Sequence, residues 1–286
     1  MHCSLIIGIA WVARFGLARD YPALSREPHR QDLESPRCGP RAIDPYPFVG
    51  SEWAVAERSQ TIGCKWQKKR SPTITVAMRR NNRVLRLDHV ELFNEDVVWL
   101  ASVERLTLGN VKVPSGLLGL LEKLWWLDIR GGSAIDLAAA RGVNKLHYLA
   151  VNQVRGLCDL SVVSEMTSLR FIDLFGLPQM TRLPSLSTLV NLERAQLGQF
   201  RGLLSLHGLL EAPQLRELVL VKKINVTSQD ISEIINHTAI KNFSWFAEGV
   251  PDKVWIPVVD KIGLPPVPFG SVEDWFGLTG SPETPH

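Results

Sequence analysis

Two aspartates are the residues of this sequence whose positions could support catalysis. The sequence contains an internal repeat, described below, and Asp128 and Asp173 occupy equivalent places in two copies of it that lie two repeats apart. If each repeat supplies one strand, a strand spacing of ~4.8 Å places the two carboxylates roughly 10 Å apart. A pair near that separation could act as the acid and base of an inverting glycosidase. Solvated charges on a sheet surface are far more common, so we expect both side chains to contact a partner and not to catalyse a reaction.

No other pattern in the sequence indicates an enzyme. It contains no phosphate-binding loop, no dinucleotide-binding glycine pattern, no H-E-x-x-H zinc motif and no G-x-S-x-G nucleophile motif. The seven histidines are scattered, and none is paired with cysteine or carboxylate at metal-ligand spacing. We therefore expect no enzymatic activity, no metal and no cofactor.

The cysteines and the start of the chain bear on its location. The four cysteines form no C-x-x-C pair, so neither a disulfide framework nor a zinc site can be assigned. They are Cys3, Cys38, Cys64 and Cys158. We interpret them as free thiols in a reducing compartment. The apolar run over 5–13 precedes Arg14 and Arg19, whereas a secretory signal places its positive charges before the apolar run. The sequence thus favours a cytoplasmic location, with secretion as the alternative.

Charge and hydropathy do not favour nucleic acid or membrane as a partner. The net charge of +3 is small, and no stretch reaches the ~18 apolar residues of a membrane span. The basic run over 65–70 could contact phosphate, but a solvated loop is the simpler interpretation. Three formal glycosylation sequons begin at Asn225, Asn236 and Asn242. They matter only in a secretory pathway, and we interpret them as coincidental.

The strongest pattern is an internal repeat with the spacing L-x-x-L-x-L. Six copies occur, and together with the weaker copy that follows them their starts lie 21 to 25 residues apart. The six are Val103/Leu106/Leu108, Leu124/Leu127/Ile129, Leu146/Leu149/Val151, Leu169/Ile172/Leu174, Leu192/Ala195/Leu197 and Leu215/Leu218/Leu220. Weaker copies stand before them at Leu85/Leu87 and after them at Ile240/Phe243/Trp245. Such a period predicts one short strand per repeat, with neighbouring repeats stacked around a continuous core.

Between the predicted strands, apolar residues recur at every third position. From Leu146 they are Val154, Leu157, Leu160, Val163, Met166 and Leu169. A period of three differs from the ~3.6 of an amphipathic α-helix and suits short 3₁₀ turns. We therefore expect the chain to return to the next strand through 3₁₀ or irregular segments.

This pattern resembles the leucine-rich-repeat family, in particular the short-repeat class of bacterial internalins and phosphatase regulators. The resemblance covers roughly residues 83–247 and implies an α/β solenoid with a parallel concave β-sheet, a mostly 3₁₀ or irregular convex side and one C-terminal helix. The sequence departs from the family at the ninth place of the repeat, where Asn or Cys is usual. That place holds Val111, Gly132, Val154, Leu177, Phe200 and Lys223. The turns must therefore bond their amides to backbone or water.

Side chains alternate along a strand, so the spacing also predicts which residues point away from the core. We number the places of a repeat from the first residue of its L-x-x-L-x-L spacing. Places four and six should be buried, while places three, five and seven should project from the concave face. Aromatic side chains ringed by arginine and aspartate gather there, a composition typical of interface hot spots. The predicted partner-binding residues are Trp126, Tyr148, Phe171, Phe175, Arg105, Arg130, Arg194, Asp128 and Asp173. Two alternatives remain open: the aromatic residues could simply stack across the strands, or the N-terminal segment could fold over them.

The chain divides by pattern into three parts. Residues 1–70 show no period and are predicted to be irregular or disordered. Residues 71–247 form the repeat domain, with a first strand over 73–76, a helix over 228–237 that starts at a Thr227–Asp230 capping box, and a closing strand over 241–246. Residues 248–286 are expected to cap the last repeat and to end in a polar tail.

These observations favour a non-catalytic module that binds a protein or peptide on its concave face. Two other functions stay open: a secreted or surface leucine-rich-repeat receptor or adhesin, and the targeting part of an enzyme. The sequence does not identify the partner or the oligomeric state.

Overall fold

The computed structural model describes residues 74, 75, 77 and 83–278. All described residues belong to one compact unit of the chain. The predictions for residues 1–70, including the apolar run over 5–13 and the basic run over 65–70, lie outside the described residues. The expectation of a polar tail after residue 278 lies outside them as well.

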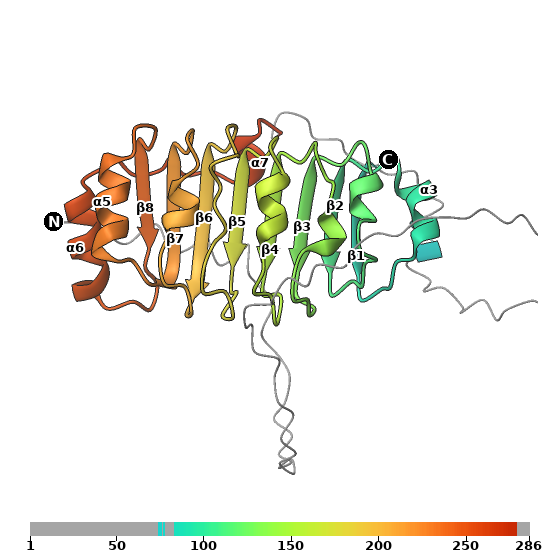
Figure 1. Cartoon of the computed structure of the whole chain (residues 1–286), viewed down its shortest axis with the longest axis horizontal. Helices are drawn as coiled ribbons and strands as arrows, with labels where there is room; N and C mark the ends of the chain where they lie inside the picture. Colours follow the sequence, from blue (N-terminus) through green and yellow to red (C-terminus); the bar gives the residue numbers. More distant parts are fainter. Residues whose placement is uncertain (1–73, 76, 78–82, 279–286) are drawn as a thin grey trace, which may run out of the picture. The chain divides into compact units, whose positions relative to one another are not determined.

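Eight parallel strands form a single open sheet, and their order in the sheet is their order in the chain (Figure 1). They are β1 (Val84–Asp88), β2 (Arg105–Gly109), β3 (Trp126–Arg130), β4 (Tyr148–Asn152), β5 (Phe171–Phe175), β6 (Arg194–Phe200), β7 (Glu217–Ile224) and β8 (Asn242–Phe246). Each strand falls on one copy of the repeated spacing. The prediction of one strand per repeat is therefore confirmed.

The strands pair in the register that the spacing predicts. Leu106 lies opposite Leu127, which in turn lies opposite Leu149, and the same places align across all seven pairs. Leu127, Leu149, Val151, Ile172 and Leu174 are buried in the main core, as predicted. Ile129 also points to this core but is only partly buried.

Short connecting elements cover one face of the sheet. Four are 3₁₀ helices, which agrees with the three-residue period: η1 (Asn94–Asp96), η2 (Leu118–Leu120), η3 (Ala138–Ala140) and η4 (Ser161–Glu165). Two single-turn α-helices, α3 (Val97–Leu100) and α4 (His207–Leu210), take the same role. Apolar residues of all these elements except η1, whose residues are polar, close the main core against the strands.

A left-handed residue turns the chain after the fifth paired position of each of the first seven strands. These residues are His89, Asn110, Gly131, Gln153, Gly176, Gln199 and Lys222. The backbone N–H of His89 donates to the carbonyl of Gly109 at 2.8 Å, and Asn110 donates to Arg130 at the same distance. These turn amides bond to the neighbouring backbone, as expected. Gly132 departs from the expectation, because its N–H donates to the side-chain Oδ1 of Asn110 at 2.8 Å.

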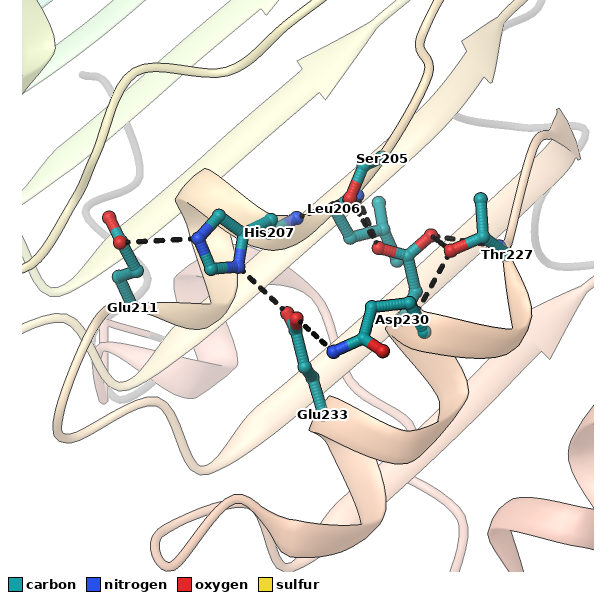
Figure 2. A network of polar contacts seen from close by, with 8 residues as sticks. Ser205, Leu206, His207, Glu211, Thr227, Asp230 and Glu233 are labelled. Carbon is teal, nitrogen blue, oxygen red and sulfur yellow. Dashed lines mark hydrogen bonds and ion pairs between the residues drawn. The ribbon is translucent and has the colours of Figure 1, made fainter.

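The predicted helix near the end of the repeats is confirmed as α5 (Ser228–Asn236). Its capping box is formed: Asp230 N–H donates to Thr227 Oγ1 at 3.0 Å, and Thr227 N–H donates to Asp230 Oδ2 at 2.8 Å. The buried Asp230 carboxylate also accepts from Ser205 Oγ at 2.6 Å and from Leu206 N–H at 2.8 Å (Figure 2). Asp230 therefore joins the start of α5 to the segment that leads into α4.

The expectation of one C-terminal helix is wrong, because two more follow α5. Helix α6 (Asp252–Ile262) packs against α5 and β8 and contributes Ile262 to the main core. Helix α7 (Val272–Trp275) lies beside the middle strands of the sheet (Figure 1). Pro257 interrupts the helical pattern of α6 in the sequence, and α7 has a single turn, so neither gave a strong periodic signal.

The predicted first strand over 73–76 is also wrong. Ile74, Thr75 and Ala77 are helical, and Ile74 is buried in the main core. The β-branched residues of this stretch favoured a strand, but packing against the core overrides that propensity. Within the described part of the chain, no helix has the length and apolar character needed to cross a membrane.

Candidate binding surface of the sheet

Three aromatic side chains form a continuous row across the middle of the sheet, on the face opposite the connecting elements. Trp126, Tyr148 and Phe171 begin β3, β4 and β5 and lie directly opposite one another in the strand register. The Trp126 and Tyr148 ring centroids are 4.1 Å apart, and those of Tyr148 and Phe171 are 5.3 Å apart. We call these three residues the aromatic row. The predicted cross-strand alignment of the three is confirmed.

The aromatic row is not exposed, in contrast to what the sequence suggested. Trp126, Tyr148 and Phe171 are only 4%, 2% and 1% exposed. They form a second apolar cluster, separate from the main core, together with Val272 of α7 and the partly buried Trp275 and Phe276. The chain's own C-terminal segment covers the row, because exposed aromatic surface of this extent is costly in water. Among the described residues, the covering segment is C-terminal, whereas the sequence had left open an N-terminal one.

The Trp275 and Phe276 rings contact the aromatic row on the face of the sheet that points away from the main core. Phe276 lies 5.8 Å from Trp126 and 6.1 Å from Tyr148, measured between ring centroids. Trp275 lies 5.5 Å from Phe171, with the two rings at 72°. Trp275 and Phe276 are themselves in contact at 4.8 Å. Most of these pairs are edge-to-face, the arrangement that the charge distribution of aromatic rings favours.

The three predicted arginines take different positions around the row. The Arg105 guanidinium lies 4.6 Å from the Trp126 ring centroid, and Nη2 is 3.8 Å from Glu273 Oε1 of α7. Arg194 lies 5.0 Å from the Phe171 centroid and pairs with Glu217 at 3.1 Å. Arg105 therefore contacts both the row and the covering segment, while Arg194 borders the row on the β6 side.

The third arginine and both aspartates are engaged with neighbouring side chains. Arg130 donates from Nη2 and Nε to the Asp128 carboxylate at 2.6 and 3.0 Å. The hydrogen bond to Asp128 raises the pKa of Arg130, against the effect of its partial burial. Asp173 accepts a hydrogen bond from Gln196 Nε2 at 3.1 Å, and Ala150 separates it from Asp128 in the strand register. The two carboxylates thus lie on alternate strands, as the repeat predicted.

Phe175, the remaining predicted aromatic, lies outside the α7 cluster. It ends β5 and is buried against Gly198 of β6. A Cβ atom at Gly198 would lie 2.6 Å from Phe175 Cδ2, so the glycine makes room for the ring. Phe175 is therefore a packing residue of the sheet and is not brought together with the aromatic row.

Four residues of this surface were missed by the sequence analysis: Trp125, Arg170, Trp275 and Phe276. Trp125 contacts Phe276 at 5.7 Å, and the Arg170 guanidinium lies 5.1 Å from the Trp275 centroid and 5.9 Å from that of Phe276. Trp125 and Arg170 precede their strands by one position, a place that the alternation rule does not assign to either face. Trp275 and Phe276 follow Ser271–Asp274, whose spacing fits a capping box and could have indicated a helix.

One ionisable group beside this surface is perturbed. Burial lowers the pKa of His147, and the positive charge of Arg170 lowers it further. His147 is therefore a neutral ring at physiological pH, in contact with Trp125 at 6.2 Å.

The described part of the chain contains no group of three or more His, Cys, Asp or Glu side chains that could hold a metal ion. No protein-family model and no curated protein matches this chain.

Proposed function

We propose that the chain is a leucine-rich-repeat solenoid and that it acts as a non-catalytic binding module for a protein or peptide. The face that carries the aromatic row is then the concave face of the solenoid. Eight parallel strands in chain order, with 3₁₀ and single-turn connections of nearly constant length, support the repeat architecture.

One observation carries the binding function. The sheet holds a short helical segment through ring contacts, the Arg170 guanidinium placed over two of its rings, and one ion pair. These are the interactions that dominate protein–peptide interfaces, where aromatic and arginine side chains supply most of the affinity. A surface that binds such a segment in the same chain has the composition needed to bind one from another protein.

Binding is favoured over catalysis because of the state of the two aspartates. Asp128 is held by Arg130, and Asp173 accepts from Gln196. An acid–base pair for glycoside hydrolysis needs one carboxyl group with a raised pKa and room for a water molecule. The Asp128 carboxylate instead forms an ion pair with Arg130 at 2.6 Å, so its oxygens are already engaged within the sheet.

The experiment compares capture of host proteins by three chains that all carry Phe276→Ala, which weakens the hold of the chain's own C-terminal segment: this chain alone and with one of two further substitutions. Arg170→Ala then acts on the partner alone and should weaken capture about fivefold or more, the usual effect of losing an arginine anchor. Arg182→Ala, at an exposed position outside this surface, is the control and should leave capture unchanged. Equal capture by all three chains would mean that the aromatic face does not bind the partner.

A second candidate, a secreted or surface receptor of the same architecture, is favoured by one observation. Cys158 is disulfide-bonded, which differs from the free thiol predicted, and its partner lies outside the described residues. Disulfides are rare in the reducing cytosol and common in secreted proteins. Mass spectrometry of the mature N-terminus, with a count of free thiols in unfolded and unreduced protein, distinguishes the two. One free thiol and a cleaved start, which removes Cys3, would support secretion, and four free thiols would support the cytoplasmic location.

A further inference from the structure

The segment that covers the aromatic row, Ser271–Leu278, has a shape that its own residues determine. At its start, Ser271 N–H donates to Asp274 Oδ2 at 2.8 Å and Asp274 N–H donates to Ser271 Oγ at 3.0 Å. At its end, Gly277 is left-handed, and the N–H groups of Gly277 and Leu278 donate to Asp274 and Glu273 at 2.9 and 2.8 Å. Both ends of the helix are thus capped within the segment.

The segment attaches to the sheet by side chains alone, as far as its described contacts go. Val272, Trp275 and Phe276 have the helical spacing of one face, and all three join the cluster with the aromatic row. Glu273 reaches Arg105 at 3.8 Å. The backbone bonds described for the segment close within it, so releasing it would break no bond of the β-ladder.

The chain that leads to the segment is hydrogen-bonded to β8 over Pro265–Val267 and is exposed after that. The carbonyl oxygens of Pro265 and Pro266 accept from Phe243 N–H and Asn242 Nδ2 at 2.9 and 3.0 Å, at the β8 edge. Val267 N–H donates to Ser244 Oγ at 2.9 Å. Beyond that point Pro268, Phe269 and Gly270 are exposed. The exposed residues 268–270 therefore link the segment to residues 265–267, which are hydrogen-bonded to β8.

We propose that the aromatic row is a receptor for a short acidic, aromatic amphipathic helix of a partner protein, and that Ser271–Leu278 is an internal copy of that ligand. The proposal rests on the proposed binding function and names its ligand class. The required features are those of the resident segment: an aliphatic residue, two aromatic residues three and four positions later, and a carboxylate that reaches Arg105. A partner binds by displacing the resident segment, so the free protein is autoinhibited.

The tether sets the strength of this inhibition. A short link gives an effective concentration on the order of 1 mM. If the isolated segment binds the row with a Kd of about 100 µM, the closed form outweighs the open form by about tenfold. An external ligand should then bind wild type about tenfold more weakly than a chain whose own segment is disabled.

The test uses full-length chains and a fluorescein-labelled peptide with the sequence of residues 270–279. Fluorescence anisotropy should show peptide binding to the Trp275→Ala/Phe276→Ala chain, and about tenfold weaker binding to wild type. Phe269→Ala is the matched control, since this aromatic side chain of the same region is 72% exposed. It should bind the peptide as wild type does. A peptide in which both aromatic residues are alanine should not bind.

Removing two partly buried rings takes away part of the second apolar cluster, so Glu273→Arg serves as a milder opening variant. It replaces the ion pair with Arg105 by repulsion and leaves the rings in place, and it should also bind the peptide more tightly than wild type. Folding of each variant is checked by circular dichroism. If folded Trp275→Ala/Phe276→Ala and Glu273→Arg chains bind no better than wild type, the proposal is wrong.

Two further outcomes separate this proposal from the proposed function. Capture of a host protein that the peptide does not compete away would overturn the ligand assignment and leave the binding function standing. A wild-type dimer that dissociates on Trp275→Ala/Phe276→Ala substitution would also overturn it, because a second copy of the chain would then fill the row. Competition of the captured protein by the peptide, in monomeric protein, supports the proposal.

Discussion

At the scale of single residues, adjacent positions of one strand belong to two different apolar clusters. Leu149 lies in the main core and Tyr148 in the cluster with α7, although they are neighbours in β4. Strand alternation predicted this division. It could not predict that the second cluster would be buried, because the side chains that cover it come from residues more than 100 positions further along the chain.

Replacing Leu149 by alanine should lower the free energy of unfolding by about 2–5 kcal/mol, because a fully buried side chain leaves a cavity. Urea denaturation followed by circular dichroism measures the change. Leu204→Ala is the matched control, since Leu204 is 56% exposed, and it should cost less than about 0.5 kcal/mol. Equal stabilities of the two variants would mean that the assigned register is wrong.

Phe171→Ala should also be strongly destabilising, by about 3–5 kcal/mol, since the ring is buried on the opposite face of the sheet. The cover supplies about 1.4 kcal/mol of this cost, the free energy of a tenfold excess of the closed form. Contacts with Tyr148 and Arg194 within the sheet supply the rest. The same urea titration measures it. A loss below about 1 kcal/mol would indicate that the segment spends much of its time away from the row in solution.

At the scale of elements, prediction from the sequence succeeded where the signal was periodic and local. The strands, the 3₁₀ connections and α5 follow from the repeat spacing and from the Thr227–Asp230 capping box. Helices α6 and α7 were missed for different reasons. Pro257 disguised α6, while α7 has one turn and no period, so that only its Ser271–Asp274 spacing marks it. The site was predicted in its sheet residues and missed in its covering residues.

The contact between α4 and α5 should depend on pH. His207 lies between two carboxylates, with Nδ1 3.0 Å from Glu233 and Nε2 3.4 Å from Glu211 (Figure 2). The hydrogen bond to Glu233 raises the pKa of His207, and hydrogen bonds from Gln229 and His207 lower the pKa of Glu233. The stabilisation is therefore complete below the ordinary histidine pKa of 6.5 and is lost as the pH rises through the raised value.

The measurement is the melting temperature of wild type and His207→Gln between about pH 5 and about pH 9. Wild type should exceed the variant by more at the acidic end than at the alkaline end. The effect should be small, because the His207 side chain is 62% exposed and water screens the pair. A difference in melting temperature that is constant across this range would contradict the assignment.

Asp230→Ala should cost about 2–3 kcal/mol, more than the ~1 kcal/mol of an ordinary helix cap. The extra cost arises because Ser205 Oγ and the Leu206 N–H lose their buried acceptor. Thermal unfolding measures the change against Gln229→Ala, which removes a neighbouring exposed residue of the same helix. If both variants cost the same, the links to Ser205 and Leu206 add nothing to the cap.

At the scale of the whole molecule, two elements that follow the repeats stabilise the sheet at separate places. Helix α6 packs at the β8 end through Ile262, and the C-terminal segment packs over β3, β4 and β5. In a stacked-repeat architecture each repeat contacts only its neighbours, so stability is close to a sum of local terms. Both elements lie beyond residue 247, where the repeat ends. Because they contact different strands, their loss should destabilise different parts of the sheet.

Hydrogen exchange measured by mass spectrometry tests that expectation. Phe276→Ala should speed amide exchange in β3, β4 and β5, which the C-terminal segment covers, and leave β8 unchanged. Ile262→Ala should speed exchange in α5 and β8, because it weakens the packing of α6, and leave β3 unchanged. A strand that loses its cover exchanges through local fluctuations that are smaller than global unfolding. If either variant instead speeds exchange evenly over all eight strands, the sheet opens as one cooperative unit. Release of the C-terminal segment would then destabilise the whole sheet and not only uncover the aromatic row.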